Sequence, residues 1–206
     1  MSQRLQVRPL NPQPRLIRQA AERIRKGGLV VYPTDSGYAF GWHIGDRDAA
    51  ERLQRIRQTG KDHNFTLVCR DLSEIATYAR IDNPTYRLLR AHTPGAYTFI
   101  LRATREVPRR LQNPKQQTVG IRVPDHPVPL ALLAELGEPL MSSSLILPDH
   151  ELPLADPDDI HDALAGRIDL LIDSGNCGLD PTTVVDLTSD LPRVLRQGRG
   201  DAGVFA

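Results

Sequence analysis

Cysteine is scarce in this sequence, with only Cys69 and Cys177 among 206 residues. The two are far apart, so they form neither a CxxC pair nor a disulfide framework. The six histidines lack metal-ligand spacing, and we expect no structural metal. No apolar run approaches the roughly 20 residues of a membrane-spanning helix. The first residues also lack the apolar core of a signal peptide, so we expect a cytoplasmic protein without membrane association.

Several familiar catalytic motifs are missing as well. The sequence contains no GxxxxGK[ST] phosphate loop, no GxGxxG fingerprint, no GxSxG elbow and no cysteine with a nearby histidine motif. A standard nucleophile is therefore not apparent, and the catalytic residues stay unassigned. An enzyme with this sequence would rely on positioning and charge neutralisation, as phosphoryl and nucleotidyl transfer allow.

The composition, with 40% hydrophobic and 25% charged residues, is that of an ordinary globular protein. Its length favours one domain over residues 1–206. The charge is uneven: residues 1–122 hold 22 Lys and Arg against 10 Asp and Glu, whereas residues 123–206 hold 4 against 15. This asymmetry indicates either a surface for a polyanion or two segments that pair with each other in the fold.

The segment Gly27–Gly41 is the one around which the rest of the chain is organised. Leu29–Tyr32 has the apolar, β-branched pattern of a short buried strand, and Pro33–Gly37 has the composition of a turn. Thr34 and Ser36 would then follow the strand, where open α/β sheets commonly place ligand-binding groups. A tight surface turn is the alternative interpretation, since turn formers dominate the composition.

Alternating helical and strand patterns along the chain predict an α/β fold. Helices are expected at residues 14–26, 46–58, 73–79 (capped by Ser73), 83–92, 128–136 and 156–166. Further strands are expected at residues 65–69, 97–102, 118–123, 139–146, 168–172, 182–187 and 192–196.

Hydroxyl and arginine side chains are placed at the ends of several of these strands. Arg122 interrupts an apolar run, so it should emerge at a cleft or find a buried partner. The serines at 142–144 occupy the middle of a predicted strand, which indicates either a polar cavity or a sheet edge. Hydroxyls together with guanidinium forks are typical of phosphate binding.

In this order and spacing, six segments resemble the YrdC-like threonylcarbamoyl-adenylate synthases, and within them the YciO-type subgroup. The segments are residues 28–41, 55–57, 93–98, 118–127, 139–146 and 178–196. The resemblance covers essentially the whole chain. It implies a single YrdC-like α/β domain in which a twisted mixed sheet with helices carries a basic concave cleft.

The resemblance also implies a reaction. L-threonine and bicarbonate would give a carbamate that attacks the α-phosphate of ATP, releasing pyrophosphate and leaving threonylcarbamoyl-AMP, which feeds the t6A-type modification of an adenosine in certain transfer RNAs. ATP would carry Mg²⁺ on its triphosphate, so no protein-bound metal is implied. By position, the amino-acid side would contain Thr34, Ser36, Arg122, Ser142 and Thr182. The nucleotide side would contain Arg55, Arg57, Asn64, Thr118, Ser144 and Arg196.

The chain departs from the synthase pattern within the expected site. Lys-x-Arg is replaced by Arg55-Ile56-Arg57, and Ser-Ala-Asn by Ser144-Leu145-Ile146. Cys69 stands where a histidine is expected. Ala96 replaces the last proline of the usual Pro-Gly-Pro, and Thr182 replaces the serine of the usual Ser-Thr-Val. Each lost polar contact can cost about 1–3 kcal/mol, which weakens the expectation of synthase activity more than that of the fold.

Three hypotheses about function follow. The first is a threonylcarbamoyl-AMP synthase with weak or altered activity. The second is an enzyme of related chemistry on another amino acid or acyl-adenylate, with Cys69 and Ile146 lining a changed pocket. The third is a protein that binds double-stranded RNA in the basic cleft, without efficient synthase activity.

Overall fold

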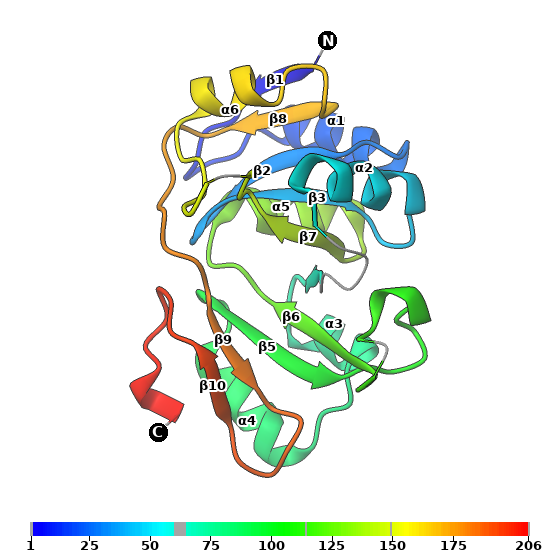
Figure 1. Cartoon of the computed structure of the whole chain (residues 1–206), viewed down its shortest axis with the longest axis vertical. Helices are drawn as coiled ribbons and strands as arrows, with labels where there is room; N and C mark the ends of the chain where they lie inside the picture. The colour runs from blue at the N-terminus through cyan, green and yellow to red at the C-terminus, as the bar shows by residue number, and fades with distance from the viewer. Residues whose placement is uncertain (1, 60–64, 114, 149, 206) are drawn as a thin grey trace.

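The computed structural model describes residues 2–59, 65–113, 115–148 and 150–205. Ten strands and six α-helices make up the fold of this described part of the chain (Figure 1). The strands are β1 (Gln3–Gln6), β2 (Val30–Thr34), β3 (Gly37–His43), β4 (Thr66–Val68), β5 (Tyr97–Arg102), β6 (Thr118–Arg122), β7 (Leu140–Ser144), β8 (Leu170–Asp173), β9 (Thr183–Asp186) and β10 (Arg193–Arg196). The helices are α1 (Pro14–Arg25), α2 (Arg47–Arg57), α3 (Leu72–Tyr78), α4 (Asn83–His92), α5 (Pro127–Leu136) and α6 (Pro157–Ala163), with short 3-10 turns η1 (Arg109–Leu111) and η2 (Gly203–Phe205).

All ten strands join one mixed sheet, in the order β1-β8-β2-β3-β7-β4-β6-β5-β9-β10. Figure 1 shows β1, β8, β2, β3 and β7 grouped in the upper half and β6, β5, β9 and β10 in the lower half. Only β4, three residues long, pairs with both groups, through β7 on one side and β6 on the other. The predicted α/β class with a twisted mixed sheet is confirmed.

The segment that organises the sequence is a β-hairpin, whereas the sequence predicted a strand at Leu29–Tyr32 followed by a turn at Pro33–Gly37. β2 continues through Pro33 to Thr34 and pairs antiparallel with β3, with Thr34 opposite Gly37. Pro33 is tolerated because β8 pairs only with Val30 and Val31, so the missing N–H of proline has no strand to bond on that side. Gly37 has φ +122°, and a Cβ there would lie 2.7 Å from the carbonyl oxygen of Gly178.

One further local prediction is corrected, and one strand was missed. The cap of α3 is Asp71, whose carboxylate accepts from the N–H of Glu74 at 2.9 Å, rather than Ser73. The N-terminal β1 was not predicted, and it pairs parallel with β8. Its four residues are too few for the alternation to be recognised in sequence.

The two faces of the sheet carry different cores. Helices α1 and α5 pack on one face, where Ala21, Ile24 and Leu132 meet Val30 and Tyr32. Helices α2, α3, α4 and α6 pack on the other face. Because successive strand residues point to opposite faces, Ser142 of β7 lies on the face of Leu140, which is part of the α1 and α5 core.

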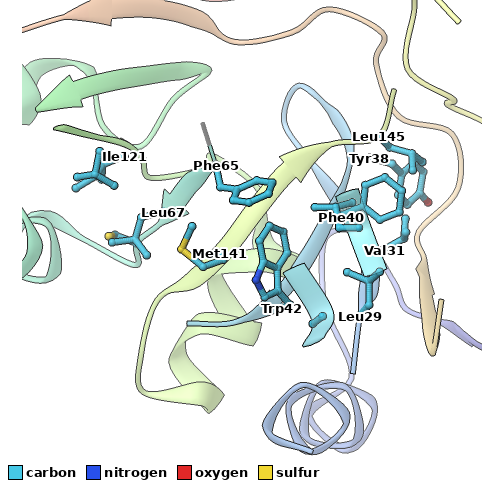
Figure 2. Close-up of a cluster of buried hydrophobic side chains, with 14 of the residues drawn as sticks. Leu29, Val31, Tyr38, Phe40, Trp42, Phe65, Leu67, Ile121, Met141 and Leu145 are labelled. Carbon is cyan, nitrogen blue, oxygen red and sulfur yellow. The ribbon is translucent and has the colours of Figure 1, made fainter. Parts of the chain in front are cut away.

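Figure 2 shows the centre of the second core, where Trp42 lies beside Met141 and Phe65. The Trp42 and Phe65 rings meet edge to face, with centroids 5.0 Å apart. Such pairs add about 0.5–1.5 kcal/mol to the burial of the rings. This contact fixes Phe65, the first described residue after position 59, at the edge of the cavity described below.

Acidic groups of the C-terminal segment pair with basic groups of the N-terminal one. Arg4 bridges Asp158 and Asp173 at 2.6 and 2.9 Å, and Arg52 pairs with Asp169 at 2.7 Å. Mutual pairing therefore accounts for part of the charge asymmetry, and binding of a polyanion stays a prediction. In the described part of the chain, no helix is long and apolar enough to cross a membrane.

Acid is expected to destabilise the fold through His126, whose Nδ1 accepts from the N–H of Val128 at 3.1 Å and caps α5. Burial lowers the pKa of His126, while Asp35 and Asp125 raise it less strongly. The unfolded chain then binds the proton more readily than the folded protein does. The contribution of neutral His126 to stability is therefore complete above pH 6.5 and is lost as the pH falls through the lowered pKa of the folded state.

Urea unfolding above and below pH 6.5 measures this effect. His126→Asn keeps a capping oxygen that does not titrate, so its stability should fall less on acidification than that of the parent protein. An equal fall in both proteins would contradict the assignment.

Candidate functional site

One row of residues crosses the open part of the sheet face that α1 and α5 leave uncovered. The strand register places Ser142 opposite Thr66, Thr66 opposite Gly120, Gly120 opposite Ile100, and Ile100 opposite Asp186. All five residues line a cavity of about 450 Å³. The floor of the cavity is therefore the sheet itself, from β7 to β9.

Most of the predicted site residues line this one cavity although they come from distant parts of the chain. They are Thr34, Ser36, Arg57, Thr118, Arg122, Ser142, Ser144, Thr182 and Arg196. Arg55 is exposed on α2 and is not among the lining residues, so its contact with a nucleotide stays a prediction. Asn64 lies outside the described residues. Because β7 is an inner strand, the serines at 142–144 mark a polar cavity rather than a sheet edge.

The sequence left open whether Arg122 emerges at a cleft or finds a buried partner. In the structure it does both, at the hairpin end of the cavity. Its Nη2 forms an ion pair with Asp35, and both side chains are only 9% exposed. Its Nη1 donates to Ser36 Oγ at 3.0 Å. Asp35 also accepts from the N–H of Asp125 at 3.2 Å. The guanidinium thus stabilises the hairpin and lines the cavity at once.

Arg57, the last residue of α2, also lines the cavity. Its guanidinium donates to Ser143 Oγ and to the carbonyl oxygen of Ile146 at 3.1 Å. Burial lowers the pKa of Arg57, but an arginine remains charged near neutral pH. Contacts to β7 and to the segment that follows it hold this positive charge in place.

Arg196 of β10 supplies another positive charge to the cavity lining. Its Nη2 donates to the Thr182 carbonyl at 2.9 Å, and Thr182 Oγ1 lies 2.8 Å from Thr98 Oγ1. A register irregularity between Val194 and Arg196 marks a bulge in β10, and both Leu195 and Arg196 line the cavity. Such bulges commonly re-aim a side chain.

The sequence analysis missed several lining residues. They are Thr66, Thr98, Asn113, Gln116, Asp186 and Arg193. Burial raises the pKa of Asp186, but hydrogen bonds from Thr188 and Arg193 outweigh it and hold the pKa below its ordinary value. The strand register would have revealed Thr66, Thr98 and Asp186, whereas Asn113 and Gln116 lie in a loop with no periodic signal.

The electrostatics of the cavity favour an anion. Its described lining contains four arginines and one carboxylate, and that carboxylate, Asp186, already pairs with Arg193 at 3.0 Å. No histidine, lysine or cysteine is among these described lining residues. Across the described parts of the chain, no group of three or more His, Cys, Asp or Glu could hold a metal ion. The arrangement can bind and orient an anionic ligand by hydroxyl and guanidinium groups.

Comparison with known proteins decides the family. The profile named Sua5/YciO/YrdC, with the description "Telomere recombination", matches residues 22–198. The chain belongs to the Sua5/YciO/YrdC family. It is 55% identical to the uncharacterized protein YciO of Escherichia coli over 205 residues, which covers 100% of both chains. The crystal structure of E. coli YciO matches with a TM-score of 0.96.

More distant members of the family have named activities or ligands. A threonylcarbamoyl-AMP synthase of Bacillus subtilis is 30% identical over 184 residues, covering 88% of this chain and 53% of the synthase. The crystal structure of P. abyssi Sua5 complexed with L-threonine is 27% identical, with a TM-score of 0.86, and covers 95% of this chain and 57% of that one.

Two departures from the family pattern are now placed in the structure. The idea that Cys69 lines a changed pocket is wrong: Cys69 is fully buried in the core beneath β4, and burial raises its pKa well above the ordinary value. Ile146 does line the cavity, and its carbonyl accepts from Arg57. The hydrocarbon side chain thus replaces an amide at the wall, while the backbone there still fixes an arginine.

Proposed function

We propose that this chain is an L-threonylcarbamoyladenylate synthase, which converts L-threonine, bicarbonate and ATP to threonylcarbamoyl-AMP and pyrophosphate. The observation that carries the proposal is one cavity whose lining combines Ser36, which bonds Arg122, with the guanidinium groups of Arg57 and Arg196. The volume of about 450 Å³ lies within the range of small-molecule sites. The P. abyssi complex with L-threonine and the B. subtilis synthase support this assignment.

The reaction needs alignment more than a nucleophilic side chain. The carbamate oxygen of N-carboxythreonine forms a bond to the α-phosphorus of ATP, and the bond from that phosphorus to the bridging oxygen of pyrophosphate breaks. In this assignment Arg122 and Ser36 orient the amino-acid carboxylate, and Arg57 and Arg196 neutralise phosphate charge. Mg²⁺ would arrive bound to the triphosphate. Asp186, the carboxylate among the described lining residues, already accepts a hydrogen bond from Arg193, so it is poorly placed to bind the metal.

Pyrophosphate release in a purified reaction tests the proposal. We expect release only when ATP, L-threonine and bicarbonate are all present. Arg196→Ala should weaken ATP binding in calorimetry by about tenfold or more, because it removes a charged hydrogen-bond donor from the cavity lining. Arg199→Ala is the matched control, since Arg199 is exposed on the same segment and is not among the described lining residues.

Each alternative predicts a different result. Pyrophosphate release with another amino acid, and none with threonine, would favour the related enzyme and overturn the synthase assignment. Binding of double-stranded RNA or transfer RNA stays a prediction. If RNA follows the arginines of the cavity, its affinity should fall steeply as salt is added.

A further inference from the structure

Arg196 lies at the end of an edge strand. β10 is the last strand in the order of the sheet, and it pairs with β9 alone among the described strands (Figure 1). Three residue pairs join the two strands, and the bulge between Val194 and Arg196 interrupts them. Three of the four residues of β10 are exposed. Such strands open easily, so Arg196 needs a further support to stay at the cavity.

The residues that follow β10 supply a support of this kind. They turn back along the start of β9, where the N–H of Arg199 donates to the Pro181 carbonyl at 2.8 Å. The N–H of Gly198 donates to Thr183 Oγ1 at 2.9 Å, and the Thr183 hydroxyl donates to the Gly200 carbonyl. Thr183 is fully buried, so one shielded hydroxyl holds two points of the returning segment.

The returning segment also lies against the oxygen that binds the Arg196 guanidinium. Arg196 donates to the Thr182 carbonyl through Nη2 at 2.9 Å and through Nε at 3.2 Å. A Cβ at Gly198 would lie 2.6 Å from that carbonyl oxygen and 2.2 Å from that of Pro181, so only glycine allows this close approach. The backbone just before β9 is thus held both by Arg196 and by the segment that follows Arg196.

An aromatic cluster anchors the far end of the same segment. The Phe205 ring lies beside His92, Tyr97 and Phe99, with centroids 4.9, 5.6 and 6.2 Å away. The Tyr97 ring also packs on Gly200, where a Cβ would lie 2.4 Å from it. These rings belong to the core on the sheet face that α4 covers, opposite the cavity. The returning segment is therefore fixed at two separate points.

We propose that residues 197–205 form a strap that holds Arg196 in position for the nucleotide, with Thr183 and Phe205 as its positioning residues. Neither of the two is among the described lining residues, so both act through Arg196. The proposal rests on the proposed function, since it explains how that site keeps a phosphate-binding arginine on an exposed edge strand. When the strap loosens, β10 opens and Arg196 has to be ordered each time a nucleotide binds, which lowers the affinity.

Calorimetry with ATP and Mg²⁺ tests the strap in two variants. Thr183→Val keeps the branched shape and removes the hydroxyl, whereas Phe205→Ala removes the anchor at the far end. Each should weaken ATP binding about three- to tenfold, less than the loss of Arg196 itself, because the guanidinium is misplaced rather than removed. Hydrogen exchange of the β10 amides should become faster in both variants.

A double-mutant cycle separates positioning from a general loss of structure. In an Arg196→Ala background, Phe205→Ala should change ATP affinity by about twofold or less, because the group that the strap positions is already absent. A general disturbance of the cavity would weaken ATP binding equally in both backgrounds. Val204→Ala is the matched control: Val204 lies in the same turn as Phe205 and is 51% exposed, so affinity and exchange should be unchanged.

Unchanged ATP affinity in both Thr183→Val and Phe205→Ala would overturn the proposal, even if β10 exchanged faster. So would equal losses in the two backgrounds of the cycle, or a parent protein that binds no ATP. Weaker ATP binding that depends on Arg196, in a protein that releases no pyrophosphate with threonine, would support the strap and reject the synthase. Pyrophosphate release by the parent protein, with unchanged ATP affinity in both variants, would give the reverse result.

Discussion

Arg57→Ala should weaken ATP binding by about ten- to a hundredfold and abolish pyrophosphate release. The variant loses a half-buried positive charge and its hydrogen bonds to Ser143 and Ile146. A charged hydrogen bond contributes about 1.5–3 kcal/mol, which corresponds to this range of affinity. Calorimetry with ATP and Mg²⁺ measures the binding, and a pyrophosphate assay measures the reaction.

Two variants of the same helix make that result specific. Arg47→Ala removes an exposed arginine of α2 that pairs with Glu51, four residues along, so ATP binding should be unchanged. Arg57→Lys keeps the positive charge but loses the planar guanidinium. We expect that it cannot bind Ser143 Oγ, the Ile146 carbonyl and a phosphate at the same time. We therefore expect Arg57→Lys to resemble alanine more than arginine. Full activity of Arg57→Lys would show that a point charge suffices and would contradict the role of the fork.

Arg122→Ala should lower the free energy of unfolding by about 3–5 kcal/mol, the range measured when one member of a buried ion pair is removed. Asp35 would remain buried without its cation, because both side chains of the pair are 9% exposed. The expected loss is large relative to the 5–15 kcal/mol by which proteins of this kind are stable. Urea denaturation followed by circular dichroism measures it.

The half-exposed pair of Arg52 and Asp169 provides the comparison, since its side chains are 32% and 29% exposed. Arg52→Ala should cost about 1 kcal/mol or less, because solvent screens such a pair. The double variant Asp35→Leu, Arg122→Met should recover much of the stability lost in Arg122→Ala, since it leaves no unpaired charge. Similar decreases in the free energy of unfolding for Arg52→Ala and Arg122→Ala would show that burial does not determine how much the Arg122–Asp35 pair stabilises the fold.

The sequence predicted the helices well and the strands unevenly, for physical reasons. Apolar periodicity and caps identify α1, α2 and α5 because these signals are local. In contrast, β3 contains Gly37 and Gly41, which read as turn residues, yet they are there to accommodate Gly178 and the Tyr32 ring. Such requirements come from neighbouring strands, so they are not visible in the segment itself.

The candidate site was predicted where chemistry and strand ends coincided. Thr34 and Ser36 were recognised because they follow an apolar strand, and Arg122 because it interrupts an apolar run. Cys69 was misplaced because its position at the end of a strand does not say which face it occupies, and the structure places it in the core. The hydrogen-bond partners of Ser142 could not be predicted, since Tyr32 and the Phe40 carbonyl lie in β2 and β3.

The shortness of β4 has a mechanical consequence. The sheet is only three residue pairs wide where β4 joins its two halves, so few backbone hydrogen bonds connect the halves. The cavity spans this seam, with Ser142 on one side and Gly120 on the other. A ligand bound across it would contact both halves, and its contacts would add to the few backbone hydrogen bonds that join them.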